Sequence, residues 1–106
     1  MLNILKNLFS QNDNTALTEA VKNDAFLVDV RSSAEFSDGS VKGAVNIPLD
    51  VLQQQLAKFK NKKNIVVFCR SGARSTQAQR ILEYNGFKNV VNGGAWHQVN
   101  QIVNKL

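Results

Sequence analysis

Apolar residues along the chain gather in short runs that are separated by stretches of helical spacing. Four nearly continuous apolar runs predict buried strands, at residues 25–30, 44–47, 65–68 and 89–92. Around these runs, apolar residues three and four positions apart predict amphipathic helices that begin near Thr15, Asp50 and Arg74 and after Gly94. Strands that alternate with helices are typical of a parallel sheet covered on both faces. The pattern therefore predicts an α/β fold.

Polar residues mark the ends of the predicted helices. Ser32 and Glu35 have the spacing of a capping box, and they precede one short helical turn. Asp50 and Gln53 repeat this spacing at the start of a longer helix. Glycines predicted to stop helices or to turn the chain are Gly39, Gly86 and the pair Gly93–Gly94.

The whole chain, residues 1–106, has the length of a single domain. Residues 1–14 are predicted to be an N-terminal extension, in which Leu2, Leu5, Leu8 and Phe9 have the spacing of a short amphipathic helix. This extension lacks the apolar core of a signal peptide. Every apolar run is far shorter than the roughly 18 residues of a membrane span. We therefore expect a cytoplasmic protein that does not bind a membrane.

The net charge of +5 favours anionic substrates or acidic partners. The basic residues are not interleaved with aromatic residues, and no DNA- or RNA-binding motif is present, so nucleic acid is not expected as a partner. The one basic cluster is predicted to be a solvated loop between a helix and a strand; it consists of Lys58, Lys60, Lys62 and Lys63.

Cys69 is the only cysteine of the chain, and His97 is the only histidine. An internal disulfide and a Cys/His metal site are therefore not expected, and no cofactor is predicted. Cys69 directly follows the most hydrophobic predicted strand and stands just before a predicted helix. In parallel sheets, ligands bind at the carboxyl ends of the strands, which is where this thiol is predicted to lie.

The loop after Cys69 contains residue types that activate a thiol. Backbone N–H groups at a helix N-terminus, together with nearby Arg70 and Arg74, lower a cysteine pKa. Gly72 lets the backbone turn close to the sulfur, and the hydroxyls of Ser71 and Ser75 can donate hydrogen bonds. A buried, inert cysteine is the alternative, but the flanking arginines and glycine favour a reactive thiolate.

Arg74 allows two interpretations. It can be a salt-bridge residue at the start of the helix. However, a cation is unfavourable at that end of the helix dipole, and this favours a bound anion beside it.

Four ordered segments resemble the rhodanese-like domain, in its short single-domain sulfurtransferase form. The resemblance extends from about Thr15 to the C-terminus. The segments are Val28–Arg31 followed by Glu35–Phe36, Gly43–Pro48, Ile65–Ser75, and Gly93–Gly94 followed by Trp96.

The resemblance implies a rhodanese-like fold with a central five-stranded parallel sheet and helices on both faces. It implies that Cys69 takes the sulfane sulfur of a thiosulfate-like donor and becomes a persulfide. Arg74 would bind the donor's sulfonate, and the backbone N–H groups of the loop would surround the persulfide, from Arg70, Ser71, Gly72, Ala73, Arg74 and Ser75. The sulfur would then pass to cyanide in an assay, or to a thiol or a protein in the cell.

The length of the loop separates this prediction from its chemical relatives. Cys69 and Arg74 are separated by four residues. Phosphatases related to this fold have one residue more, which makes room for a phosphate, so a small phosphatase or an arsenate-type reductase is disfavoured. A non-catalytic or regulatory rhodanese module that binds a partner is the second hypothesis. Of the two arginines, Arg74 is predicted to bind the donor, and Arg70, whose side chain is expected at the rim, is predicted to bind either substrate or a partner protein.

Three further residues are predicted to support the site. Asp29 and Arg31 are expected to pair across the loops near the thiol, a structural rather than a catalytic role. Trp96 is expected to be a core or rim aromatic. The family often has a His-Ile pair after the glycine that is Gly39 here, whereas this chain has Ser40–Val41.

Overall fold

The computed structural model describes residues 15–106, so the predicted helix within residues 1–14 lies outside the described residues. Helices and strands alternate along the chain as predicted. The elements are a first helix at residues 15–22, β1 (Phe26–Asp29), α2 (Ser33–Ser37), β2 (Val45–Asn46), the 3₁₀ segment η1 (Leu49–Phe59), β3 (Ile65–Cys69), α3 (Ala73–Tyr84), β4 (Val90–Ala95) and α4 (Trp96–Asn104). No helix of residues 15–106 is long and apolar enough to cross a membrane.

The strands form one parallel sheet with the order β2-β1-β3-β4. The predicted α/β fold is confirmed, but the five strands implied by the resemblance are not: the sheet of residues 15–106 has four strands. Each strand overlaps one of the four apolar runs of the sequence.

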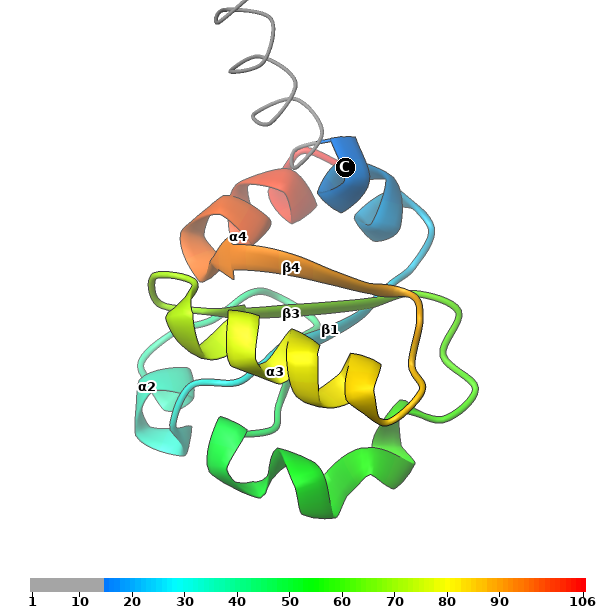
Figure 1. The fold of residues 1–106 in the computed structure, drawn as a ribbon. Coiled ribbons are helices and arrows are strands. Elements are labelled where there is room, and N and C mark those ends of the chain that lie inside the picture. Colours follow the sequence, from blue (N-terminus) through cyan, green and yellow to red (C-terminus); the bar gives the residue numbers. More distant parts are fainter. Residues whose placement is uncertain (1–14) are drawn as a thin grey trace, which may run out of the picture.

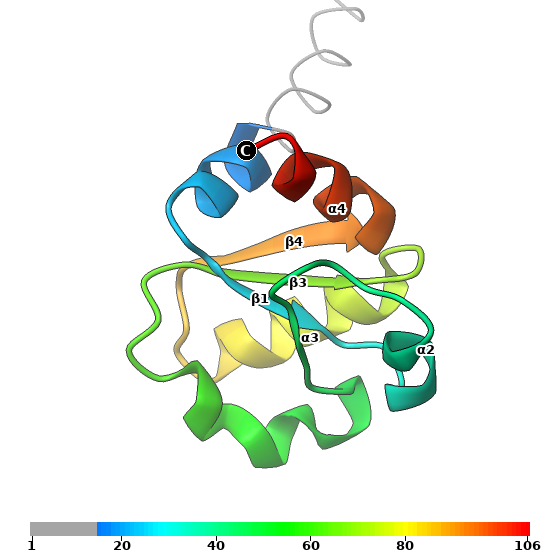
Figure 2. The ribbon, with the colours of Figure 1, turned by 180° about the vertical axis from the view of Figure 1, so that it is seen from behind.

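Helices cover both faces of the sheet (Figure 1). The helix at residues 15–22 and α4 lie on one face, and α3 and η1 lie on the other, as the view from behind also shows (Figure 2). Central strand β3 is buried on both sides, with Val67 and Cys69 in the core under α3 and η1, and Val66 and Phe68 in the core under α4. The thiol is therefore at the end of the most protected strand.

Two helix starts test the predicted capping boxes. The box of Ser32 and Glu35 is confirmed, because the Ser32 side chain accepts from the Glu35 backbone and the Glu35 carboxylate accepts from the Ser32 backbone. The box predicted at Asp50 is wrong: η1 begins at Leu49, directly after Pro48, and no side chain caps it. Proline already fixes the backbone ahead of the first turn, so the start does not depend on an acidic cap.

The glycines predicted as a turn belong instead to β4. Strand pairing continues to Ala95, with one extra residue in β4 opposite Val67 and Phe68 of β3. Gly93 is the extra residue, and a Cβ built there would stand 2.7 Å from Cγ2 of Val99 in α4. The absence of a side chain thus lets α4 pack directly onto the sheet, and the bulge shifts the end of β4 relative to the Cys69 strand.

Candidate active site

The site begins where β3 ends and the chain turns into α3 (Figure 1). Cys69 is the last residue of β3, and its side chain is fully buried. Gly72 is the N-cap of α3 and has φ of +107°, in the left-handed region that favours glycine. This backbone conformation folds the loop back so that its N–H groups point at the Cys69 sulfur.

Three hydrogen bonds converge on the sulfur. The backbone N–H groups of Gly72 and Ser75 donate to Sγ over 3.0 and 3.4 Å, and the Ser75 hydroxyl oxygen is 3.5 Å from it. Burial by itself raises the pKa of Cys69, but the hydrogen bonds from the side chain and backbone of Ser75 and from the backbone of Gly72 and Ser71 outweigh it, so the pKa is lowered. The site therefore favours the thiolate, which is the reactive form of cysteine.

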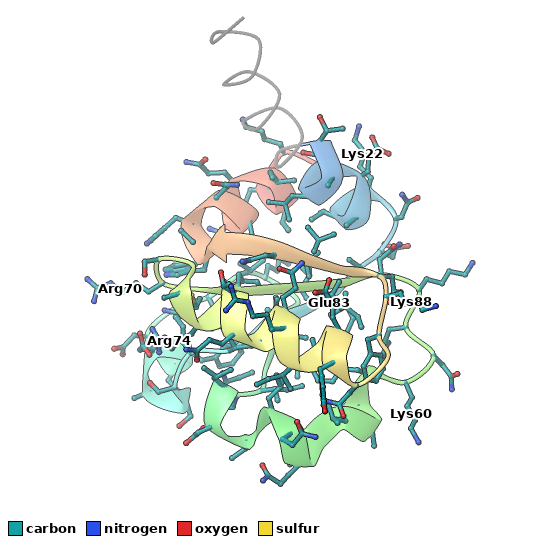
Figure 3. All side chains as sticks on the ribbon, viewed as in Figure 1. Lys22, Lys60, Arg70, Arg74, Glu83 and Lys88 are labelled. Carbon is teal, nitrogen blue, oxygen red and sulfur yellow. The ribbon has the colours of Figure 1, made fainter. Side chains whose placement is uncertain are left out.

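Arg74, which is partly exposed, is paired with Glu35. Its two terminal nitrogens donate to the two carboxylate oxygens of Glu35 over 2.7 and 3.0 Å. This pairing lowers the pKa of Glu35 to about 2 and raises that of Arg74. The pair joins the first turn of α3 to α2, and Figure 3 shows Arg74 beside that helix. Of the two interpretations of Arg74, the structure has the salt bridge.

The other predicted loop residues lie at the surface. Arg70, Ser71 and Ala73 are exposed. Arg70 points away from the molecule at the tip of the loop (Figure 3). Arg70 and Arg74 therefore have different surroundings: Arg70 extends into solvent, and Arg74 is bound to a carboxylate.

Asp29 and Arg31 form a buried ion pair next to the loop. Arg31 donates through Nε and Nη2 to the Asp29 carboxylate, with a shortest distance of 2.7 Å, and Nη2 also donates to the carbonyl of Gly39. Ser40 donates to the same carboxylate over 2.7 Å. Ser40 stands at the position where the family often has histidine, and in this chain its hydroxyl donates to the Asp29 carboxylate.

Trp96 extends this pair toward α4. The Arg31 guanidinium lies over the indole ring, 4.9 Å from its centroid, and the ring also packs against the core under α4. A cation above an aromatic face is attracted by the ring electrons. Asp29, Arg31 and Trp96 thus hold together the end of β1, the loop between α2 and β2, and the start of α4. None of the three hydrogen-bonds to the Cys69 sulfur, whose partners are Gly72 and Ser75.

Two contacts of the site were not predicted from the sequence. The sequence pattern predicts Glu35 first as a helix cap, yet its carboxylate also binds Arg74. Asn92 was not singled out, yet its side chain accepts a 2.7 Å hydrogen bond from Ser75. A signal for Asn92 was available, because it is a polar residue inside an otherwise apolar strand.

A groove runs beside Arg74. Its walls are mostly apolar, and its lining comes from the end of β1, the start of α2, the start of η1 and the first turn of α3, with Val30, Ser32, Pro48, Leu49, Asp50 and Arg74. Within residues 15–106, no group of three or more His, Cys, Asp and Glu side chains could hold a metal ion.

The parallel sheet and the thiol loop agree with what comparison with known proteins finds. The family model for the rhodanese-like domain matches residues 10–97, so the chain belongs to the rhodanese-like domain family. It is 36% identical to a sulfurtransferase of Allochromatium vinosum, over 69% of this chain and 72% of that protein.

The chain is also similar to a larger protein and to solved structures. The chain is 38% identical to a tRNA uridine(34) hydroxylase of Wigglesworthia glossinidia brevipalpis, over 77% of this chain but only 29% of that protein. Among solved structures, an E. coli rhodanese with anions matches 70% of this chain and 89% of that one, with 33% identity and a TM-score of 0.64. A human single-domain sulfurtransferase matches 92% of this chain and 89% of that one, with 28% identity and a TM-score of 0.60.

Proposed function

We propose that this protein is a sulfurtransferase in which Cys69 carries sulfane sulfur as a persulfide. The observation on which the proposal rests is the set of donors at the sulfur, with the N–H groups of Gly72 and Ser75 at 3.0 and 3.4 Å. These donors stabilise a negative charge on sulfur at the N-terminus of α3. Membership of the rhodanese-like family and the similarity to a sulfurtransferase support the same activity.

The first half-reaction loads the sulfur. The Cys69 thiolate attacks the outer sulfur of thiosulfate, the S–S bond of thiosulfate breaks, and sulfite leaves with the electron pair. The product is a Cys69 persulfide whose charge is on the new terminal sulfur. No oxidant or reductant is needed, because the sulfane sulfur is transferred as such between two nucleophiles.

The second half-reaction removes the sulfur from Cys69. A thiophilic acceptor attacks the terminal sulfur of the persulfide, and the Cys69 thiolate leaves. With cyanide the product is thiocyanate, and with a thiol it is a new persulfide. Because Cys69 is the only cysteine of the chain, the acceptor comes from outside, either as a small thiol or as a protein. Arg70, exposed beside the site, is the residue we assign to contact with a protein acceptor.

Arg74 is the residue we assign to the sulfonate of the donor. It lines the groove at the start of α3, and its positive charge suits an anionic donor. Its terminal nitrogens are bound to Glu35, so the sulfonate either displaces this carboxylate or binds through the remaining N–H groups of the guanidinium.

Intact mass spectrometry tests the proposal. Incubation with thiosulfate, in the absence of reductant, is expected to add the mass of one sulfur atom, and cyanide is expected to remove it with release of thiocyanate. A Cys69→Ser variant is expected to keep its circular dichroism spectrum and to gain no sulfur. A folded wild-type protein that gains no sulfur from thiosulfate, and forms no thiocyanate, contradicts the proposal for this donor.

A second candidate function is a rhodanese module that binds a partner without turning over thiosulfate. The observation that favours it is the two-point pairing of Arg74 with Glu35, which occupies the cation expected to bind the donor. The mass experiment separates the two functions when it is repeated with a low-molecular-weight persulfide. Sulfur uptake from the persulfide supports transfer, whereas no uptake from either donor supports the binding module.

A further inference from the structure

Asn92 connects the edge strand of the sheet to the residues that contact the thiol. It belongs to β4, where alternation along the strand directs its side chain to the α3 face, as for Val90 two residues earlier. Its Oδ1 accepts hydrogen bonds from the Ser75 hydroxyl over 2.7 Å and from the Gly94 backbone over 2.9 Å. Its Nδ2 donates to the Thr76 hydroxyl over 2.9 Å. The Asn92 amide is therefore fixed on three sides.

The orientation of this amide follows from its partners. The Gly94 N–H can only donate, so the atom that faces it is the oxygen of Asn92. The Thr76 hydroxyl gives its own proton to the carbonyl of Gly72 over 2.8 Å, so it accepts from the Asn92 nitrogen. The same Asn92 oxygen faces Ser75, and Ser75 must be the donor in that contact.

Ser75 has one hydroxyl proton and three neighbours that can accept it. These are Oδ1 of Asn92 at 2.7 Å, the carbonyl of Gly72 at 3.1 Å and Sγ of Cys69 at 3.5 Å. Ser75 is fully buried, so water does not supply a further donor to the sulfur there. Whichever group accepts the proton deprives the other two of it.

We propose that Asn92 is a positioning residue for the thiol, which competes with the Cys69 sulfur for the single hydroxyl proton of Ser75. While Cys69 is a thiol, its S–H points to the Ser75 oxygen, and the Ser75 proton stays on the side of Asn92. When Cys69 ionises, the Ser75 hydroxyl rotates and donates to the thiolate, and Asn92 keeps only the Gly94 donor. Asn92 thus sets how readily the thiolate forms.

The charged groups around Cys69 do not depend on Asn92. Strand β4 has no titratable residue. Arg74 of α3, paired with Glu35 of α2, is near the thiol, and the Asp29–Arg31 pair follows β1. Asp50 of η1 lines the groove beside Arg74. The hydrogen-bond partners of Asn92 are instead Ser75, Thr76 and Gly94, none of which is charged.

The titration of Cys69 tests the proposal, independently of any sulfur donor. Cys69 is the only cysteine, so the ultraviolet absorbance of the thiolate, with Cys69→Ser as the blank, follows this group alone. In Asn92→Leu the competing acceptor is absent, and the titration midpoint is expected to fall by about 0.5 to 1 pH unit. In Asn92→Asp the acceptor is stronger and negatively charged, and the midpoint is expected to rise.

The same substitutions in a Ser75→Ala background show whether the effect runs through the Ser75 proton. There, Asn92→Leu is expected to leave the midpoint unchanged. The matched control is Thr76→Val, which removes the other hydroxyl bound to Asn92 but does not touch the Ser75 proton, and it is expected to leave the midpoint near that of the wild type. A midpoint that does not fall in folded Asn92→Leu overturns the proposal. The proposal is also overturned if Asn92→Asp raises the Cys69 midpoint equally in the wild-type and Ser75→Ala backgrounds, because the new charge would then act on the thiol directly.

Discussion

The carboxylate of Glu35 and the guanidinium of Arg74 meet at two points, Nη1 to Oε1 at 2.7 Å and Nη2 to Oε2 at 3.0 Å. Glu35 belongs to a five-residue helix, and Arg74 belongs to the first turn of the helix after the thiol loop. The same carboxylate also caps α2 through Ser32. One side chain therefore links the local stability of α2 to the cation beside the thiol.

Replacement of Glu35 by Gln should free Arg74 for an anionic donor. Loss of the carboxylate charge leaves the Arg74 guanidinium available to the sulfonate of the donor, so the KM for thiosulfate is expected to fall by up to about fivefold. The kcat should stay the same, because the thiol and its donors are unchanged. Steady-state thiocyanate formation measures both constants. Glu83→Gln, an exposed acidic change at the far end of α3 (Figure 3), is the matched control. A higher KM in Glu35→Gln would instead mean that the carboxylate orients Arg74 for binding.

The stability of the fold should depend on pH through the same carboxylate. Arg74 holds the pKa of Glu35 at about 2, below its ordinary value of 4.5. A lowered pKa in the folded state stabilises the protein above pH 4.5, and this contribution is lost as the pH falls from about 4.5 toward 2. Urea unfolding at several pH values measures it. Glu35→Gln is expected to lose less stability than the wild type over this interval, and equal slopes for the two proteins would contradict the assignment.

Replacement of Asp29 by Asn should destabilise the protein strongly. Asp29 is fully buried, and it neutralises Arg31, which is also buried. Removing one partner of a buried ion pair leaves an uncompensated charge and costs about 3 to 5 kcal/mol. The free energy of unfolding from urea titration is the measurement. Asp38→Asn, an exposed change at the end of α2, is the control and should alter stability by about 0.5 kcal/mol or less. A loss in Asp29→Asn as small as that of the control would contradict a charge-balancing role.

Replacement of Gly93 by Ala should also destabilise the protein, for a steric reason. The new methyl would stand 2.7 Å from Cγ2 of Val99 and 3.1 Å from Cγ1 of Val66, closer than carbon atoms pack. Overpacking of this kind costs about 1 to 3 kcal/mol. In a Val99→Ala background the nearest clashing atom is gone, so the same Gly93→Ala change is expected to cost less. Thermal or urea unfolding measures the loss in free energy of unfolding caused by Gly93→Ala in each background. Equal losses in the two backgrounds would mean that Gly93 is needed for its backbone conformation and not for space.

Local patterns sufficed for much of the fold. The apolar runs predicted all four strands of the described residues, because a strand buried on both faces needs apolar side chains in both directions. The capping box at Ser32 was also predictable, since both partners are three residues apart. The start of η1 and the end of β4 were not, because Pro48 and the bulge at Gly93 depend on how the chain meets its neighbours.

The partners of the loop side chains could not be predicted in this way. Arg74 and Glu35 are 39 positions apart, and Ser75 and Asn92 are 17 apart. Nothing in the spacing of such residues says that they meet. The dipole argument favoured a bound anion beside Arg74 over a salt bridge, whereas the structure has the salt bridge, because Glu35 of α2 lies next to the first turn of α3.

The order of strand, cysteine and helix could be predicted from local sequence, and the strand at Ile65–Cys69 and the helix at Ala73–Tyr84 have this order. Local hydrophobic spacing predicts the strand and the helix, and glycine predicts the loop between them, because both signals depend only on residues a few positions apart. The surroundings of the thiol, in contrast, depend on contacts between segments that are far apart in the chain. The Ser75 proton, the Asn92 oxygen and the Glu35 carboxylate come together because the parallel sheet and its helices bring distant segments to one end of the fold, where hydrogen bonds between them can form.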